Sequence, residues 1–198
     1  MTRRRRFQRP LGELRYRKMF VIAAEGEKTE PQYFAIFNTR SSVVHVKCIK
    51  GRQASSPPQV LRRMRENLNK EGLKKSDEAW LVVDKNGWTD EHLEQLHQWS
   101  KDADNYGFAL SNPKFEYWLL LHFEDGAGIA SSRNCLDRLK RYLPDYDKGI
   151  DPRIITQEMI DEAIQRAKRR DNPPCIDWPR TIWCTTVYRL VENILRTR

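Results

Sequence analysis

Residues 19–34 read MFVIAAEGEKTEPQYF, and this stretch sets the fold class. Its apolar run, residues 19–24, ends at Glu25 and Gly26, a pattern typical of a buried strand followed by a tight turn. Pro31 then suits the first turn of a helix with an aromatic inner face. A strand that leads directly into a helix predicts one unit of an α/β protein.

The same alternation of strand and helix continues along the chain. Each predicted strand is followed by a turn and by a segment with helical periodicity, and Ser111-Asn112-Pro113 is typical of a helix start. This order favours a mostly parallel sheet with helices on both faces. The predicted strands are residues 19–24, 43–49, 79–83 and 106–110.

The C-terminal third has a different pattern. From about residue 130 onward no strand is evident, and helices are expected near residues 134–143, 156–170 and 179–196. The last of these has an apolar face that we expect to dock on the sheet, although it could instead bind a partner protein. The sequence therefore predicts a basic tail over 1–17, an α/β core over 18–128 and a helical part over 129–198 packed on that core.

Charge indicates a polyanionic partner. The 198 residues carry a formal net charge of +9, with 32% charged and 10% aromatic residues, which is a polar but globular composition. Clustered Lys and Arg residues favour nucleic acid, because neutralised phosphates release counterions; alternatively, the charge only keeps the protein in solution. Trp88 and Trp178, in predicted loops, are the candidates for stacking on bases. The predicted nucleic-acid contacts are Arg62, Arg63, Arg65, Lys85, Trp88, Lys140, Arg141, Lys168, Arg169 and Arg170.

The sequence contains no membrane or secretion signal. No apolar run approaches the roughly 20 residues of a transmembrane helix, and the N-terminal RRRRF leads into polar residues. The four cysteines form no CxxC pair and no zinc spacing, so we interpret them as reduced thiols. These features predict a cytoplasmic protein. The sequence leaves the oligomeric state open, and a homo-oligomer is among the options.

Three acidic residues are placed where α/β proteins build their sites. Glu25 follows the first predicted strand, Asp84 follows the third, and Glu116 lies just past the fourth. Carboxylates gathered at the carboxyl ends of parallel strands can bind a hard cation such as Mg²⁺. The alternative is structural, because such acids also cap turns and complement a helix dipole.

Five segments in this order resemble the RloB family of the Toprim superfamily. They are EGEKTEPQYF (25–34), VVDKN (82–86), SNPKFEYWLLLHF (111–123), YDKGID (146–151) and TTVYRLVENI (185–194). The resemblance covers about residues 18–195. It implies a Toprim-like α/β core, a role in bacterial phage defence or abortive infection, and an ABC- or OLD-type ATPase as a partner.

The resemblance also implies roles for individual residues. Glu25 would act as a metal ligand or general acid/base, and Gly26 allows the tight turn beside it. Glu30 matches a second acid that could bind metal or orient a neighbour. Asp84 matches the first aspartate of the DxD motif and Asn86 the second, where the chain departs from the superfamily pattern.

Two further segments complete the implied site. Asn112 and Glu116 match the NPxFE element, in which Glu116 would complete the metal shell. Lys148 matches a family lysine that would contact phosphate or stabilise developing charge. Structural roles remain the alternative for each of these residues.

The leading hypothesis is therefore a Mg²⁺- or Mn²⁺-dependent Toprim-type endonuclease. It would act on RNA, with tRNA as one option, or on DNA, as the effector of an abortive-infection system. The alternative is a catalytically degenerate module that binds nucleic acid or a partner ATPase without cleavage. Asn86 favours the alternative, because a neutral amide binds a divalent cation less strongly than a carboxylate does.

Overall fold

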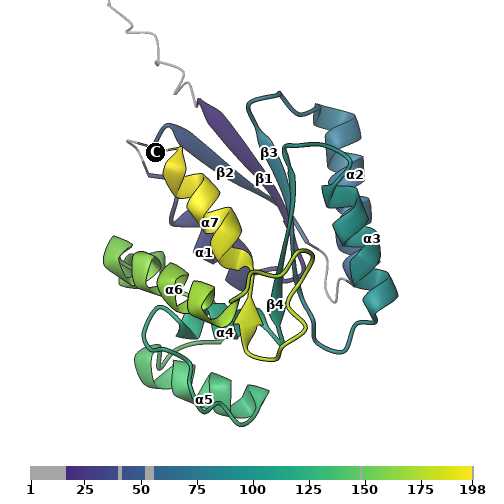
Figure 1. Ribbon diagram of the computed structural model, residues 1–198. Coiled ribbons are helices and arrows are strands. Elements are labelled where there is room, and N and C mark those ends of the chain that lie inside the picture. The colour runs from purple at the N-terminus through teal and green to yellow at the C-terminus, as the bar shows by residue number, and fades with distance from the viewer. Residues whose placement is uncertain (1–16, 40–41, 52–55, 148, 198) are drawn as a thin grey trace, which may run out of the picture.

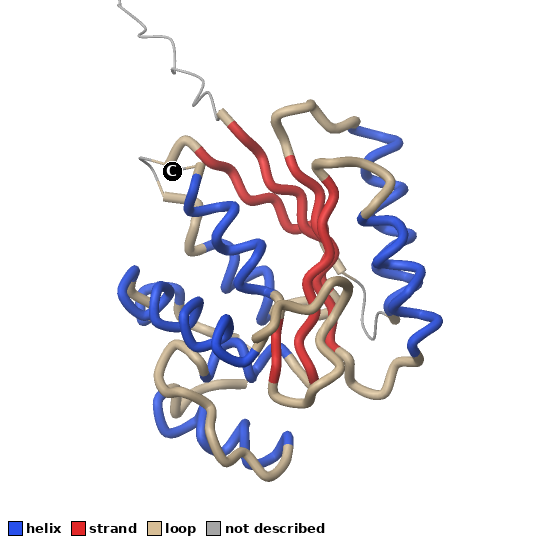
Figure 2. The backbone as a smooth tube through the Cα atoms, viewed as in Figure 1, coloured by secondary structure: helices blue, strands red, loops and turns tan. Residues whose placement is uncertain are grey.

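A five-stranded sheet forms the centre of the molecule (Figures 1 and 2). The computed structural model describes residues 17–39, 42–51, 56–147 and 149–197. The sheet order is β2-β1-β3-β4-β5; the first four strands are parallel, and β5 is antiparallel to β4. This is the predicted α/β class, consistent with a Toprim-like fold. The strands are β1 (Lys18–Ala24), β2 (Val44–Ile49), β3 (Glu78–Asp84), β4 (Tyr106–Asn112) and β5 (Cys184–Thr185).

Helices cover both faces of this sheet. Figure 1 shows α2 and α3 on one face, with α1, α4, α6 and α7 on the other. Among the described helices, none combines enough length with enough hydrophobicity for a transmembrane span. The helices are α1 (Thr29–Ala35), α2 (Pro57–Glu71), α3 (Asp90–Ser100), α4 (Phe115–Leu120), α5 (Ser132–Tyr142), α6 (Gln157–Arg170) and α7 (Val187–Arg196), with a 3₁₀ turn η1 (Pro152–Ile154).

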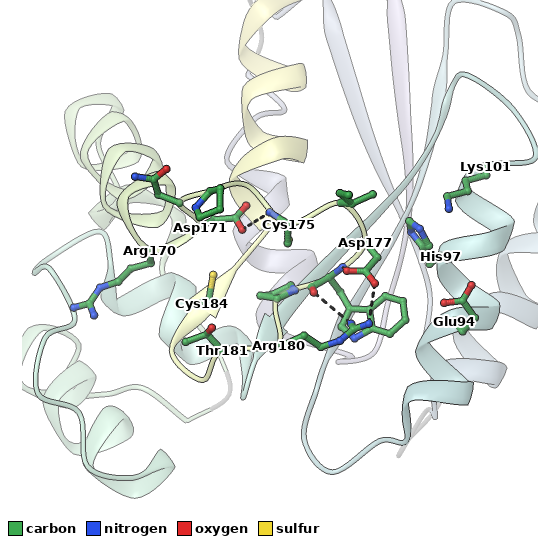
Figure 3. A pocket seen from close by; sticks show the side chains of 15 residues that line it. Glu94, His97, Lys101, Arg170, Asp171, Cys175, Asp177, Arg180, Thr181 and Cys184 are labelled. Carbon is green, nitrogen blue, oxygen red and sulfur yellow. Dashed lines mark hydrogen bonds and ion pairs between the residues drawn. The ribbon is translucent and has the colours of Figure 1, made fainter.

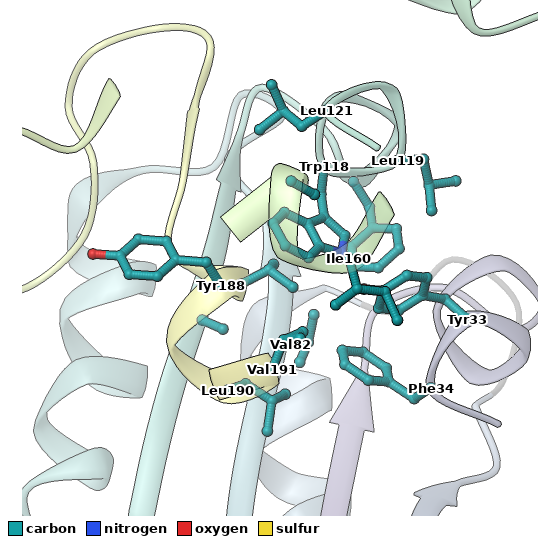
Figure 4. Packing of buried hydrophobic residues seen from close by; sticks show 14 of the residues in the cluster. Tyr33, Phe34, Val82, Trp118, Leu119, Leu121, Ile160, Tyr188, Leu190 and Val191 are labelled. Atoms are coloured by element: carbon teal, nitrogen blue, oxygen red, sulfur yellow. The ribbon is translucent and has the colours of Figure 1, made fainter. Parts of the chain in front are cut away.

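Alternating side chains of the strands build two separate cores. On β1, Phe20 and Ile22 face the layer of α1, α4, α6 and α7, whereas Val21 and Ala23 face α2 and α3. Figure 4 shows the larger core, in which Trp118 of α4 and Leu190 of α7 pack near Tyr33 of α1. Both faces are apolar because both are covered, as expected for a parallel sheet.

The position of the helices creates a switch point between β1 and β3. The helix after β1 packs on one face of the sheet and the helix after β2 packs on the other. Strand order therefore reverses at β1, and the carboxyl ends of β1 and β3 lie at the position where open α/β sheets bind ligands.

A side chain protects the outer edge of β2. The amide of Asn38 accepts the backbone N–H of Val46 at 2.7 Å and donates to the carbonyl of the same residue at 2.8 Å. These are the two hydrogen bonds that another strand would make, so Asn38 blocks edge pairing at this position.

The C-terminal part differs from the sequence prediction in two respects. The expected helix over 179–196 begins only at Val187, and residues 184–185 form β5, although no strand was predicted after residue 130. A two-residue strand is too short to produce a period-two pattern, and its side chains are held by contacts with β4. The apolar face of α7 packs on the sheet as expected, with Val187, Leu190, Val191 and Ile194 buried.

Candidate functional site

Glu25 and Asp84 lie side by side at the switch point. Glu25 directly follows β1, and Asp84 is the last residue of β3. The Glu25 Oε2 atom accepts the backbone N–H of Asp84 at 3.1 Å, and its Oε1 atom accepts the indole N–H of Trp88 at 3.3 Å. The sequence prediction that these two acids meet is supported by this direct contact between their residues.

Glu30 folds back from α1 over the turn that precedes it. Its side chain is buried, and Oε1 accepts the backbone N–H of Gly26 at 3.1 Å. A Cβ atom at position 26 would lie 2.1 Å from Glu30 Oε2. The φ angle of Gly26 is not in the left-handed region, so the close approach of the Glu30 carboxylate, rather than the turn, favours glycine at this position.

Glu116 reaches the same place from the first turn of α4. Asp84 Oδ1 accepts the backbone N–H of the neighbouring Phe115 at 2.8 Å, which ties the start of α4 to the end of β3. Glu116 is buried and accepts a hydrogen bond from the hydroxyl of Tyr146, which also lies 3.4 Å from Thr29 Oγ1. Tyr146 thus connects α4, α1 and the segment after α5.

The four acids form one electrostatic cluster. Burial raises the pKa of Asp84 well above its usual value, and the charges of Glu30, Glu25 and Glu116 raise it further. Burial, together with the charges of Glu116 and Glu25, raises the pKa of Glu30 to about 7. Burial also raises the pKa of Glu25, against hydrogen bonds from Asp84 and Trp88. We call these residues, Glu25, Glu30, Asp84 and Glu116, the acidic cluster.

Two cations lie at the rim of the acidic cluster. Lys114, at the N-terminus of α4, is close enough that its positive charge opposes the rise in the Glu25 pKa that burial causes. Arg63 reaches across from α2 and donates to the carbonyl of Ala24, the residue before Glu25. Arg63 was predicted to contact nucleic acid in general, whereas Lys114 was not singled out at all. The sequence feature that could have identified Lys114 is its position two residues before Glu116 in NPKFE.

The carboxylates of the acidic cluster are the kind of ligand that a hard divalent cation prefers, but they are not arranged as in a metal site. Besides burial, the charges of neighbouring carboxylates raise the pKa of Glu30 and of Asp84, and a cation would relieve this repulsion. However, no group of three His, Cys, Asp or Glu side chains in the described part of the chain converges with the geometry of a metal site. Backbone N–H groups hold oxygens of Glu25 and Asp84 instead.

Asn86 has a structural reason for its identity. Asn86 and Gly87 both have positive φ, at 22° and 82°, in a turn closed by the N–H of Trp88 and the carbonyl of Lys85 at 2.7 Å. Positive φ at both central positions is the type I′ pattern, in which Asn-Gly is the preferred pair. Its exposed side chain makes no hydrogen bond to another described residue.

Asn112 has a structural role in this arrangement. It ends β4, and its amide donates to the carbonyls of Pro179 and Arg180, both at 3.2 Å. The helix predicted to start at Asn112-Pro113 begins instead at Phe115, after Lys114. Asn112 therefore holds the C-terminal loop, because strand β4 continues to this residue.

Several predicted nucleic-acid contacts are engaged within the protein. Lys85 pairs with Asp90 at 2.5 Å, and Lys168 pairs with Glu192 at 2.5 Å. Trp88 is half-buried against Glu25. Arg62, Arg65, Lys140, Arg141, Arg169 and Arg170 are exposed, whereas Lys148 lies outside the described residues.

A small cavity of about 50 Å³ adjoins the acidic cluster. Lys114 and Glu116 line one side, and Cys135 and Trp183 line the other. Burial raises the pKa of the Cys135 thiol to about 12, so this cysteine stays protonated at neutral pH. The space is large enough for a water molecule beside Glu116.

The comparisons with known proteins return one family. A family model described as RloB-like protein matches residues 20–194, nearly the whole chain. No curated protein and no solved structure matches the chain.

Proposed function

The chain belongs to the RloB-like protein family, and from this premise we propose that it is a divalent-metal-dependent nuclease. The observation that supports this proposal best is the acidic cluster at the carboxyl ends of β1 and β3. Carboxylates at this edge of a parallel sheet, with Lys114 and Arg63 beside them, suit phosphodiester chemistry. The substrate would be RNA, with tRNA as one option, or DNA.

Three residues of the acidic cluster would bind the metal ion. Glu25, Asp84 and Glu116 would hold Mg²⁺ or Mn²⁺, with the Asn86 amide as a further oxygen donor. Such an ion supplies Lewis-acid stabilisation of phosphoryl charge and lowers the pKa of a bound water.

The positioning residues lie around those donors. Tyr146 fixes the Glu116 carboxylate through its hydroxyl, and Glu30 fixes the backbone at Gly26. Lys114 would bind a phosphate oxygen of the substrate, taking the part that the family pattern assigns to Lys148.

The biological role that we propose is that of a toxic effector in phage defence. The family resemblance supports this role, together with control by an ABC- or OLD-type ATPase partner and a cytoplasmic location. Expression of the wild-type chain should then cause cell toxicity that depends on the acidic cluster.

The test compares substitutions of two acids of the cluster with substitution of an exposed acid nearby. We expect Glu25→Ala and Asp84→Ala to abolish both cleavage of cellular nucleic acid and toxicity. Glu27→Ala is the matched control, because Glu27 is an exposed acid two residues from Glu25. Sequencing of RNA and DNA ends after induction identifies the substrate, and cleavage by Glu25→Ala at the wild-type level would refute the assignment.

A binding module remains the second candidate, and one observation favours it. The oxygens of Glu25 and Asp84 accept backbone N–H groups instead of converging with a third acid, within the described residues. Calorimetric titration with Mg²⁺ and Mn²⁺ separates the two candidates. A nuclease should show a saturable metal site that Asp84→Ala removes, whereas a binding module should show none.

A further inference from the structure

A second hollow lies away from the acidic cluster. It has a volume of about 640 Å³ and lies between α3 and the loop that connects α6 to β5 (Figure 3). Glu94 and His97 of α3, with Lys101 directly after it, line one side, and Asp177 and Arg180 of the loop line another. Its volume is within the range of roughly 300–1,000 Å³ that small-molecule sites occupy. We call it the loop cavity.

A flat cationic surface forms part of its wall. The guanidinium of Arg180 lies 3.8 Å from the ring centroid of Trp178, and Asp177 holds it at 2.8 Å. Trp178 was predicted to stack on bases, but its ring is buried against Phe108 and His97 and cannot do so itself. The half-exposed guanidinium plane of Arg180 offers a stacking surface instead of the Trp178 ring, because guanidinium planes stack on nucleobases.

Positive charge remains available at the two ends of the loop cavity. Three acids line the cavity: Asp171 pairs with Arg189, which lies outside the lining, at 2.7 Å, and Asp177 pairs with Arg180. Glu94 forms no ion pair with a described residue and leaves one negative charge on the α3 side. Lys101 and Arg170 are exposed, and neither forms an ion pair within the described part of the chain. Two unpaired cations that flank a stacking plane suit the phosphates on either side of a base.

The loop cavity is connected to the acidic cluster by ordered structure. Asn112 binds the carbonyl of Arg180, and the preceding residue, Ser111, is in register with Asp84 across β3 and β4. Lys85, next to Asp84, lowers the pKa of Asp90 through a hydrogen bond and its charge, and the charge of Arg180 lowers it further. Asn112 and β4 therefore link the loop that carries Arg180 to the strand that ends at Asp84.

We propose that the loop cavity binds one unpaired nucleotide of the substrate strand, on the path that leads to the acidic cluster. Its base would stack on Arg180, and Lys101 and Arg170 would bind the flanking phosphates. This inference rests on the proposed function in one respect, namely that the substrate is nucleic acid. It adds that the substrate is single-stranded where it enters the cavity.

The test measures binding separately from cleavage. Fluorescence anisotropy with short single-stranded RNA and DNA oligonucleotides, in EDTA, gives the affinity of the full chain. We expect Arg180→Ala to weaken binding about 30-fold, the middle of the range for loss of one stacked base. Arg196→Ala is the matched control, since Arg196 is also exposed and pairs with an acid on its own segment. Equal affinity of both variants would overturn the proposal.

Abasic oligonucleotides test the base contact directly. Removing one base should weaken binding to the wild-type chain and to Arg196→Ala, but not to Arg180→Ala, which has already lost the stacking surface. Lys101→Ala should reduce the slope of log affinity against log salt by about 0.7, the value for one phosphate of a single strand. An unchanged slope, or an abasic effect that survives in Arg180→Ala, would contradict the inference.

Two further outcomes separate this inference from its alternatives. If AMP binds with Arg180-dependent affinity while oligonucleotides do not, the site serves a free nucleotide and the strand proposal is wrong. If oligonucleotide binding depends on Arg180 but Mg²⁺ or Mn²⁺ produces no cleavage, the nuclease proposal fails and the loop cavity stands. If the protein cleaves nucleic acid but its binding does not depend on Arg180, the loop-cavity proposal fails and the nuclease proposal stands.

Discussion

The Glu30 carboxyl makes stability depend on pH in an unusual direction. Its side chain is 5% exposed, and burial together with the charges of Glu116 and Glu25 raises its pKa from 4.5 to about 7. Between these two values the folded chain retains a proton that the unfolded chain has released. The contribution of protonated Glu30 to the stability of the folded chain is therefore complete below about pH 4.5, and it is lost as pH rises through about 7.

Substituting Glu30 by Gln should remove this dependence. A pKa shift from 4.5 to about 7, converted at 1.36 kcal/mol per pKa unit, corresponds to about 3 kcal/mol of unfolding free energy. Glu30→Gln should thus match the wild type or be slightly less stable at pH 5, and be more stable at pH 8 by up to that amount. The substitution should also lower the pKa of Asp84, because Glu30 is the neighbouring charge that raises this pKa most.

Urea denaturation followed by tryptophan fluorescence, at pH 5 and pH 8 in EDTA, measures the effect. Glu27→Gln, at an exposed position, should follow the wild type at both pH values. Mg²⁺ at pH 8 should raise the stability of the wild type, since a cation relieves the same repulsion. If wild type and Glu30→Gln lose the same free energy between pH 5 and pH 8, the buried-carboxylate reasoning is refuted.

Three other substitutions test separate parts of the structure. Gly26→Ala should cost about 1–3 kcal/mol in urea denaturation, because its Cβ would meet Glu30 Oε2 at 2.1 Å, and combining it with Glu30→Ala should restore most of that loss. Asn38→Ala should expose the backbone of Val46 and increase self-association in sedimentation velocity, with Asn38→Asp giving a smaller increase. Asn86→Asp should leave stability nearly unchanged, because Asp-Gly also suits a type I′ turn, and should increase Mg²⁺ affinity in calorimetry if position 86 faces the ion.

Local sequence patterns were sufficient for the four parallel strands of the central sheet. The apolar runs that end at Glu25 and Asp84 mark β1 and β3 because both faces of a parallel sheet are buried. Their order, with a helix after each strand, then places the acids at one edge without further information. The inference that these acids meet needed only topology, and the contact between Glu25 and the Asp84 backbone agrees with it.

The remaining features depend on contacts that sequence spacing does not reveal. Trp178 looked like an exposed loop residue, yet its ring packs into the core formed with α3, because the loop folds back on that helix. Lys85 looked like a free cation, yet the tight turn brings it to Asp90. Lys114 was not predicted as a site residue, because only the fold brings it close to Glu25, which is distant in the chain.

The choice between nuclease and binding module therefore depends on different residues than the sequence suggested. Asn86 was the main argument for a degenerate site, but its positive φ gives Asn a backbone reason that is independent of metal. The observation that now favours degeneracy is the set of backbone N–H groups that occupy oxygens of Glu25 and Asp84. Each carboxylate has two oxygens and several lone pairs, so a bound N–H leaves acceptor capacity for a cation. Metal titration of the wild type, rather than the identity of residue 86, consequently decides between them.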